Sequence, residues 1–204
     1  MSVYFILEML GTLAFAISGI RLASAKRFDW FGAYVVGFTT AIGGGTLRDV
    51  MLSMTPFWML DGIYLVVTAV ALGIVIVLGR YLIRLNNTFF IFDAIGLGLF
   101  TVVGIEKTLA AGFPLWVAVI MGTLTGAAGG VLRDILINEE PLIFRKEIYA
   151  LACVFGGVVF WACGQVGITG AVLQITTAAA VIALRIVAVH YGLKLPTLKG
   201  EEKR

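Results

Sequence analysis

The chain has 204 residues, of which 60% are hydrophobic and 13% are charged, and its mean hydropathy is +1.03. A soluble domain needs a charged surface, so this composition excludes a soluble protein and indicates an integral membrane protein in a lipid bilayer. The formal net charge is +3. Because the basic residues form no dense patch and no stripe interleaved with aromatic residues, nucleic acid is not expected as a partner.

Apolar windows long enough to cross a bilayer recur along the chain. A hydrocarbon core of roughly 30 Å needs about 20 helical residues, and long apolar runs without alternation favour helices over a transmembrane barrel. The seven windows that we count cover residues 4–22, 30–54, 62–83, 89–105, 114–137, 148–166 and 168–191. The prediction is therefore an all-α integral membrane protein. It consists of a single transmembrane domain, residues 1–204, with seven transmembrane helices and a polar tail at 194–204.

The distribution of basic residues predicts the orientation in the membrane. Lys and Arg follow the first, third and fifth windows and recur in the tail, at Arg21, Lys26, Arg27, Arg80, Arg84, Arg145 and Lys146 before the tail itself. Because cytoplasmic loops are enriched in these residues, the N-terminus is predicted outside and the C-terminus in the cytoplasm. The first window has no basic residue before it and no small-residue cleavage pattern after it, so it is expected to be retained.

The sequence contains an internal duplication at an offset of 85 residues, without gaps. ILEMLGTLAFAISGI, from Ile6, falls on IFDAIGLGLFTVVGI, from Ile91, and GGTLRDVM, from Gly44, falls on GGVLRDIL, from Gly129. The identical pairs include Gly11 and Gly96, Gly19 and Gly104, Gly37 and Gly122, Gly44 and Gly129, Gly45 and Gly130, Arg48 and Arg133, Asp49 and Asp134, and Pro56 and Pro141. Glu8 falls on Asp93, so each copy keeps a carboxylate in its first window.

Each copy contains three windows, in repeat one (about 4–84) and repeat two (about 89–167). An odd number of crossings makes the second copy enter the membrane from the opposite side, so the repeats are predicted to be inverted. The seventh helix, about 168–191, lies outside the duplication. Inverted repeats are typical of proteins whose ion or substrate site forms near the membrane midplane, between discontinuous helices.

The glycine clusters predict where such discontinuities lie. Glycine costs a helix about 1 kcal/mol relative to alanine, so Gly43, Gly44 and Gly45 predict a kink or an unwound stretch within the membrane. Free carbonyl groups there, and at Gly129 and Gly130 of the second copy, would replace the hydration water of a cation. The threonines that add hydroxyl ligands are Thr39, Thr40, Thr46, Thr123 and Thr125.

Two plainer interpretations of the same residues stay open. Glycines in membrane helices also serve close packing, and Gly122, Gly126 and Gly130 form a series of small residues spaced four apart. Each threonine also has an acceptor in its own helix, the carbonyl group four residues earlier.

The charged residues in the duplicated motif need partners inside a membrane. Arg48 and Asp49 are adjacent and diverge by about 100° on a helix, so we expect crossed pairs, Arg48 with Asp134 and Arg133 with Asp49, which can also form a gate. The alternative is that Arg48 extends to the membrane surface. For Glu8 and Asp93, two placements stay open: a functional carboxylate in a cavity, or an interfacial residue.

Motifs for catalysis and cofactor binding are not found. There is no Ser/His/Asp set, no zinc spacing of cysteines and no P-loop, so no enzyme activity, no cofactor and no dedicated metal site are expected. Cys153 and Cys163 lie about 15 Å apart along one predicted helix, so they are interpreted as small buried apolar residues. His190 stands alone near a helix end, which favours a structural role over metal binding.

GGGTLRD in the second window, AGGVLRD in the fifth, the seven windows and the duplication together resemble the prokaryotic branch of the trimeric intracellular cation channel (TRIC) family. This resemblance implies a homotrimer in the plasma membrane of a prokaryote. It implies a pore in each subunit, lined by the first, second, fourth and fifth helices, that conducts monovalent cations, chiefly potassium and secondarily sodium. The kinks that shape the pore would fall at Gly43, Gly44, Gly45, Ala128, Gly129 and Gly130.

Two other functions stay open. Bacterial relatives of the family are also labelled glycine-transporter-like, and carriers share the architecture of inverted repeats with broken helices. A secondary transporter of a small solute, such as the amino acid glycine, is therefore the alternative to a channel. The third hypothesis is a membrane interaction protein whose glycines only pack helices.

Overall fold

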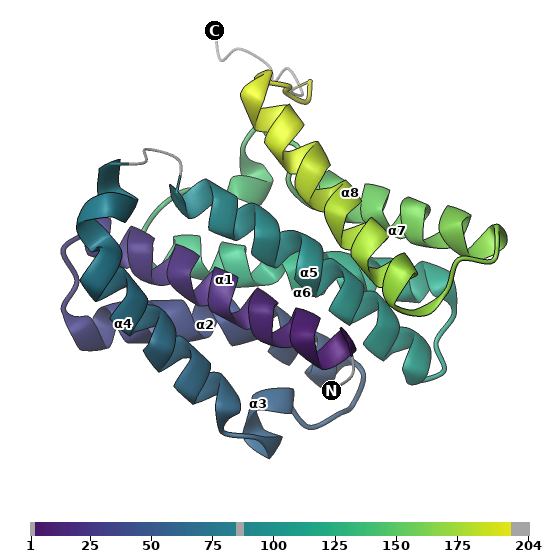
Figure 1. Cartoon of the computed structure of the whole chain (residues 1–204), viewed down its shortest axis with the longest axis horizontal. Helices are drawn as coiled ribbons and strands as arrows, with labels where there is room; N and C mark the ends of the chain where they lie inside the picture. Colours follow the sequence, from purple (N-terminus) through teal and green to yellow (C-terminus); the bar gives the residue numbers. More distant parts are fainter. Residues whose placement is uncertain (1–2, 85–87, 197–204) are drawn as a thin grey trace, which may run out of the picture.

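The computed structural model describes residues 3–84 and 88–196, which form helices and connecting loops (Figure 1). The helices are α1 (Val3–Ala25), α2 (Trp30–Met51), α3 (Phe57–Leu60), α4 (Ile63–Arg84), α5 (Thr88–Ala110), α6 (Leu115–Leu136), the 3₁₀ helix η1 (Leu142–Phe144), α7 (Ala150–Gln165) and α8 (Gly170–His190). Within these ranges no β-strand occurs, only an isolated bridge between Glu147 and Lys194. The predicted all-α class is confirmed; most of the predicted polar tail, residues 197–204, lies outside the described residues.

Each predicted window contains one long helix, but several boundaries differ. α2 ends at Met51 because Ser53 adopts a left-handed conformation, with φ of 57°, and Pro56 follows. α5 continues to Ala110, beyond the predicted end at residue 105. Four helices of the described chain, α1, α5, α6 and α8, are long and apolar enough to cross a membrane by length and composition. The apolar parts of α4 and α7, Ile63–Gly79 and Ala150–Gln165, are shorter.

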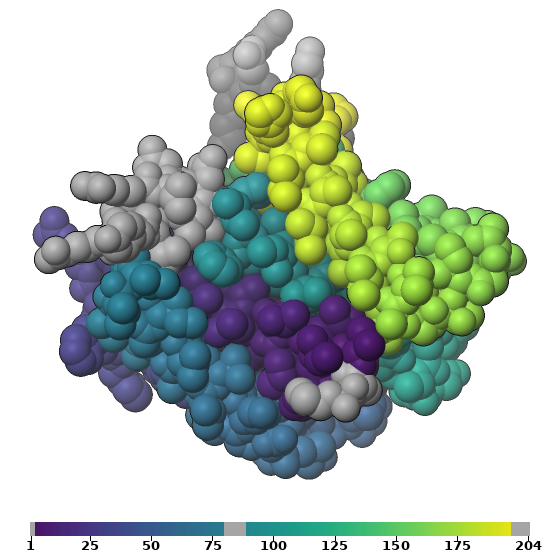
Figure 2. Space-filling model, viewed as in Figure 1, coloured from purple at the N-terminus to yellow at the C-terminus, as the bar shows by residue number. Residues whose placement is uncertain are grey.

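Four helices form a closed ring. α1 packs against α2 and α5, and α6 packs against the same two helices. α4 covers α1 and α2, whereas α7 and α8 pack on each other and against α5 and α6, on another side of the molecule (Figure 1). Figure 2 shows the face on which α1 lies between α4 and α5. We call α1, α2, α5 and α6 the four-helix ring.

The buried core is mostly apolar, but the distribution of exposed and charged residues differs from that of a soluble protein. Large apolar side chains are exposed along the long helices, for example Phe31, Val77, Trp116 and Trp161. The largest fully buried side chains are instead three arginines, Arg48, Arg133 and Arg185. An apolar exterior around charged groups is the arrangement expected where lipid replaces water as the solvent.

The glycines predicted a kink or an unwound stretch, and the unwound stretch is wrong. α2 is helical without interruption through residues 43–45, and α6 through residues 128–130. Three glycines cost a helix about 3 kcal/mol relative to alanine. A single main-chain group left without a hydrogen bond in an apolar interior costs several kcal/mol, so continuing the helix is the cheaper arrangement.

Glycines instead allow the closest approach between α2 and α6. A methyl group added at Gly44 would overlap the main-chain carbonyl oxygen of Thr125, and one at Gly129 would overlap that of Thr40. These two contacts are 85 residues apart in the chain and equivalent in the duplication. Since residue 40 meets 129 and residue 44 meets 125, α2 and α6 cross in opposite directions with their backbones in contact.

The middle of the four-helix ring is filled by an aromatic pair. Phe15 of α1 and Phe100 of α5 have ring centroids 5.3 Å apart and are 1% and 2% exposed. They too are equivalent positions of the duplication. A methyl group at Gly96 would overlap the Phe15 ring, so glycine provides the space for this pair.

Candidate functional site

The buried charges on the ring helices form two clusters. We call the first the Asp49 cluster; it consists of Glu8, Arg48, Asp49 and Lys107. The second, the Asp134 cluster, consists of Ser18, Asp93, Arg133 and Asp134. Because α2 and α6 run in opposite directions, their C-terminal ends place the two clusters at opposite ends of the ring. Arg48 and Arg133 lie roughly 18 Å apart along the helix axes, at ~1.5 Å per residue.

In the Asp49 cluster both carboxylate oxygens of Asp49 are used. Arg48 donates to Oδ1 from Nε at 2.8 Å, while Lys107 Nζ and the main-chain N–H of Phe57 donate to Oδ2 at 3.0 and 2.9 Å. The Phe57 ring lies below both cations, 5.8 Å from the Arg48 guanidinium carbon and 5.6 Å from Lys107 Nζ. Glu8, 5% exposed, interacts with the hydroxyl of Tyr64.

The Asp134 cluster repeats this arrangement with different partners. Arg133 donates from Nε to Asp134 Oδ1 at 2.9 Å, and the main-chain N–H of Leu142 donates to Oδ2 at 3.1 Å. The second guanidinium nitrogen, Nη1, donates to Ser18 Oγ at 2.8 Å and to Asp93 Oδ1. Asp93 is fully buried, and one of its oxygens has no hydrogen-bond partner among the described residues.

The predicted crossed pairs are wrong. Arg48 pairs with Asp49, its neighbour in sequence, and Arg133 pairs with Asp134. Adjacent side chains leave a helix in different directions, but the arginine side chain is long enough to reach the carboxylate of its neighbour. Each Asp also accepts a hydrogen bond from a main-chain N–H of the segment after its helix, that of Phe57 or Leu142. The alternative in which Arg48 extends to the membrane surface is also wrong, since its side chain is 1% exposed.

The threonines that were predicted as cation ligands mostly bond within their own helices. Four threonine hydroxyls, those of Thr40, Thr46, Thr123 and Thr125, donate to the carbonyl group four residues earlier, at 2.6 to 2.9 Å, as the plainer interpretation expected. Thr46 also accepts from Trp58 Nε1 at 3.0 Å, and Thr39 is half-buried.

Two of the residues that were predicted to line the pore, Thr123 and Ala128, face away from the four-helix ring. Thr123 and Ala128 line an apolar groove of about 390 Å³ together with Phe144. The groove lies on the side of α6 opposite to Gly129, which contacts α2.

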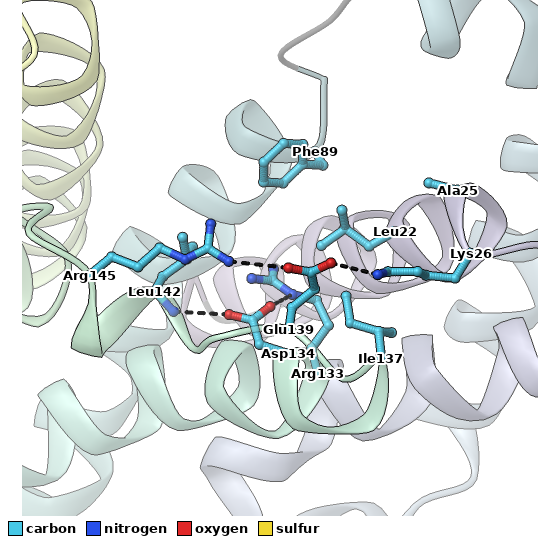
Figure 3. Close-up of a pocket in the computed structure, with 10 residues that line it drawn as sticks. All are labelled: Leu22, Ala25, Lys26, Phe89, Arg133, Asp134, Ile137, Glu139, Leu142 and Arg145. Atoms are coloured by element: carbon cyan, nitrogen blue, oxygen red, sulfur yellow. Dashed lines mark hydrogen bonds and ion pairs between the residues drawn. The ribbon is translucent and has the colours of Figure 1, made fainter.

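A cavity of about 220 Å³ opens at the Asp134 cluster (Figure 3). We call it the Glu139 cavity, and its lining residues are Leu22, Ala25, Lys26, Phe89, Arg133, Asp134, Ile137, Glu139, Leu142 and Arg145. Figure 3 shows the Glu139 carboxylate between two cations, with Lys26 Nζ at 2.5 Å and Arg145 Nη2 at 3.6 Å. The hydrogen bond and the charge of Lys26 lower the pKa of Glu139 below its ordinary value of 4.5.

A wider cavity of about 620 Å³ lies at the other end of the ring. We call it the Glu106 cavity, and it is lined by Tyr4, Glu106, Lys107, Leu109, Ala110 and Phe160. The two cavities correspond in part under the duplication, because Tyr4, Lys107 and Ala110 are the equivalents of Phe89, Leu22 and Ala25. They differ elsewhere, since the Arg-Asp pair of α6 lines the Glu139 cavity, whereas Phe160 of α7 lines the Glu106 cavity. A hollow therefore lies next to a charged cluster at each end of the ring.

Several residues of these sites escaped the sequence analysis. Lys107 and Glu106 fall just beyond the predicted end of the fourth window, although a longer window would have included them. Arg185 stands within the seventh window, where an ionisable residue in a membrane helix is by itself a sign of function. Ser18 and Tyr149 carry no such signal, since a buried hydroxyl cannot be told from an ordinary one in a single sequence.

The sequence model of the glycine transporter family matches residues 5–80 and 90–165. The chain belongs to this family. The two matches begin 85 residues apart, the offset of the duplication. The UPF0126 inner membrane protein YadS of Escherichia coli strain K12 is 40% identical to the chain over 199 residues, which is 96% of each protein.

Solved structures of TRIC channels have the same fold as this chain. A TRIC trimeric intracellular cation channel orthologue from Rhodobacter sphaeroides has a TM-score of 0.88 and 32% identity, covering 94% of this chain and 99% of the other. Another TRIC cation channel has a TM-score of 0.84 and 34% identity, covering 97% and 98%. The predicted resemblance to the TRIC family is confirmed.

Proposed function

We propose that this chain is a channel for monovalent cations, chiefly potassium and secondarily sodium, with a separate path in each subunit. The path leads from the Glu106 cavity past the Asp49 cluster, between the helices of the four-helix ring, and past the Asp134 cluster to the Glu139 cavity. The observation that carries the proposal is that a hollow lies next to a charged cluster with a buried carboxylate at each of the two ends of one ring.

Charge favours cations along this path. In the Asp134 cluster two carboxylates face one guanidinium group, so the cluster attracts a cation even though Arg133 is ionised. In the Asp49 cluster two carboxylates, Glu8 and Asp49, are balanced by Arg48 and Lys107. Lys107 is the partly exposed member, 18% accessible at its side chain, and it borders the Glu106 cavity. Displacing this ammonium group from Asp49 would free a carboxylate for a passing cation.

The centre of the path is closed in this conformation. Phe15 and Phe100 fill the ring between the two clusters, and an apolar constriction of this kind excludes water and ions. Opening then requires the rings to move apart. At Gly44 and Gly129 the backbones of α2 and α6 are in contact with no side chain between them, and we propose that the two helices slide past each other there when the path opens.

Membrane topology and assembly are part of the same proposal. The long helices α1, α2, α4, α5, α6, α7 and α8 would cross the plasma membrane of a prokaryote seven times, with the N-terminus outside and the C-terminus in the cytoplasm. Two inverted repeats then contain three crossings each, which the double match of the family model supports. The channel would be a homotrimer, as the name of the Rhodobacter sphaeroides orthologue indicates for that protein, and would need no cofactor, dedicated metal or catalytic residue.

A secondary transporter of glycine is the second candidate, and the description of the matching family favours it. Reconstituted liposomes separate the two functions. A channel gives potassium flux that follows the membrane potential and does not saturate with glycine. A carrier gives saturable uptake of labelled glycine and exchange across the bilayer without potassium conductance, and that result would replace the channel proposal.

A further inference from the structure

The last helix stands outside the duplication but carries buried polar residues. The family model matches residues 5–80 and 90–165 and leaves α8 uncovered. Gln174, Thr177 and Arg185 of this helix are 8%, 0% and 0% exposed. Ionisable residues are rare in membrane helices and usually mark functional positions, so Arg185 needs a role that compensates for its burial.

Arg185 is held at the end of the ring that contains the Asp134 cluster. Its Nη1 donates to the main-chain oxygen of Ile148 at 2.6 Å, and its Nη2 lies 3.6 Å from Glu147 Oε2. The guanidinium carbon lies 4.9 Å from the ring centroid of Tyr149 and 5.1 Å from that of Phe90. The cation therefore joins the start of α5 to the residues just before α7.

Tyr149 connects Arg185 to the charged cluster. A methyl group added at Gly130 would overlap the Tyr149 hydroxyl and would lie 3.6 Å from Arg133 Nη2, so both groups border the same glycine. Tyr149 is 1% exposed. Since the Arg185 guanidinium packs against this ring, it restricts the position of the hydroxyl beside Arg133.

Gln174 makes the corresponding contact at the other end. Its amide nitrogen donates to both carboxylate oxygens of Glu106, at 2.7 and 2.6 Å. Glu106 lines the Glu106 cavity and precedes Lys107, which pairs with Asp49. One helix therefore supplies a buried polar side chain next to each charged cluster.

We propose that Arg185 and Gln174 are positioning residues for conduction, through which α8 sets the geometry of the two ends of the path separately. Arg185 fixes Tyr149 beside Arg133. Gln174 fixes Glu106 in the wall of the cavity that Lys107 also lines. This inference rests on the proposed channel function. Its consequence is sidedness: a change at one contact alters ion passage at one end of the path and leaves the other end unchanged.

Single-channel currents of the purified protein in symmetric potassium chloride test the inference at both polarities. Arg185→Gln and Tyr149→Phe are expected to change the current at one polarity by about twofold to thirtyfold, the range for residues that modulate a site without touching its ligand. Gln174→Leu is expected to change the current at the opposite polarity. Arg185→Lys, which keeps the charge but loses the planar stacking, should resemble Arg185→Gln.

Tyr34→Phe is the control, because the Tyr34 hydroxyl donates to the main-chain oxygen of Leu65 at 3.0 Å, outside both charged clusters. It is expected not to reproduce the sidedness of Tyr149→Phe. Equal changes at both polarities, or unchanged currents in all α8 variants, overturn the inference. If Arg185→Gln gives no folded protein, Tyr149→Phe and Arg185→Lys decide. Wild-type protein without unitary currents would instead refute the proposed function itself.

Discussion

The ring centroids of Phe15 and Phe100 lie 5.3 Å apart in the middle of the four-helix ring, with the ring planes tilted by 37°, although 85 residues separate them in the chain. Each comes from the same position of one repeat, so the duplication builds the constriction from two equal halves. The charged clusters lie on either side of it. This arrangement makes the aromatic pair the barrier between two polar ends.

Shortening one of these rings should open the path. Phe15→Ala or Phe100→Ala is expected to raise potassium flux into liposomes by about tenfold or more, the change that follows from a shift of ~1.4 kcal/mol between closed and open states. Phe31→Ala is the control, because Phe31 is 76% exposed on the outside of α2. Flux that stays at the wild-type level in both ring variants would show that the constriction lies elsewhere.

Glycines at the crossing of α2 and α6 should tolerate no side chain. Gly44→Ala and Gly129→Ala force a methyl group against a main-chain carbonyl group, so both should lower the unfolding temperature in detergent. Leucine at either position should abolish flux. Gly73→Ala is the control, since nothing lies within 4 Å of that site, and alanine there favours the helix by about 1 kcal/mol. Equal unfolding temperatures for all three alanine variants would contradict the close contact.

The stability of the fold should depend on the ion pairs between sequence neighbours, such as Arg48 and Asp49, and not on crossed pairs between the two repeats. Asp49→Asn leaves Arg48 and Lys107 without their shared carboxylate, and breaking a buried pair typically costs about 3–5 kcal/mol. The variant should therefore unfold more easily than Asp61→Asn. Asp61 is exposed, and the amide oxygen of asparagine can still accept the hydrogen bond from the main-chain N–H of Ile63. The crossed double variant Arg48→Asp with Asp134→Arg should be no better than the worse single variant. Recovery of flux in that double variant would support the crossed pairing instead.

Acid should loosen the mouth of the Glu139 cavity. The pKa of Glu139 is lowered by Lys26, so the ionic contact is fully present above the ordinary value of 4.5 and is lost as the pH falls through the lowered pKa. Acidifying the bath on that side should therefore change the single-channel current within this acid range, and Glu139→Gln should remove the effect. Glu140→Gln is the neighbouring control. An unchanged pH profile in the Glu139 variant would assign the effect to another group.

The sequence was sufficient for the coarse architecture, because apolar windows and the 85-residue offset are properties of composition and order alone. The sequence also showed that the duplicated Arg-Asp pairs stand near the ends of the second and fifth windows. It was insufficient for the backbone at Gly44, since local propensity counts the cost of glycine but not the packing against Thr125. Likewise, the pairing of Arg48 with Asp49 depends on the loop that follows the helix, where Phe57 fixes the carboxylate.

Contacts between residues far apart in the chain could not be predicted from a single sequence. Lys107 reaches Asp49 across 58 positions, and Arg185 reaches Ile148 across 37. Lys107, Ile148 and Arg185 lie outside the duplicated motif, so the internal repeat gave no guide to these two contacts. The partners of Lys107 and Arg185 are therefore known only from the folded structure.

The reversal potential of the purified protein in asymmetric potassium chloride tests the central claim most directly. A path lined by buried carboxylates predicts discrete unitary currents that reverse near the potassium equilibrium potential. It also predicts that Asp93→Asn moves the reversal potential toward zero. Currents that reverse at the chloride potential, or a bilayer without unitary currents, would contradict a cation path through the ring.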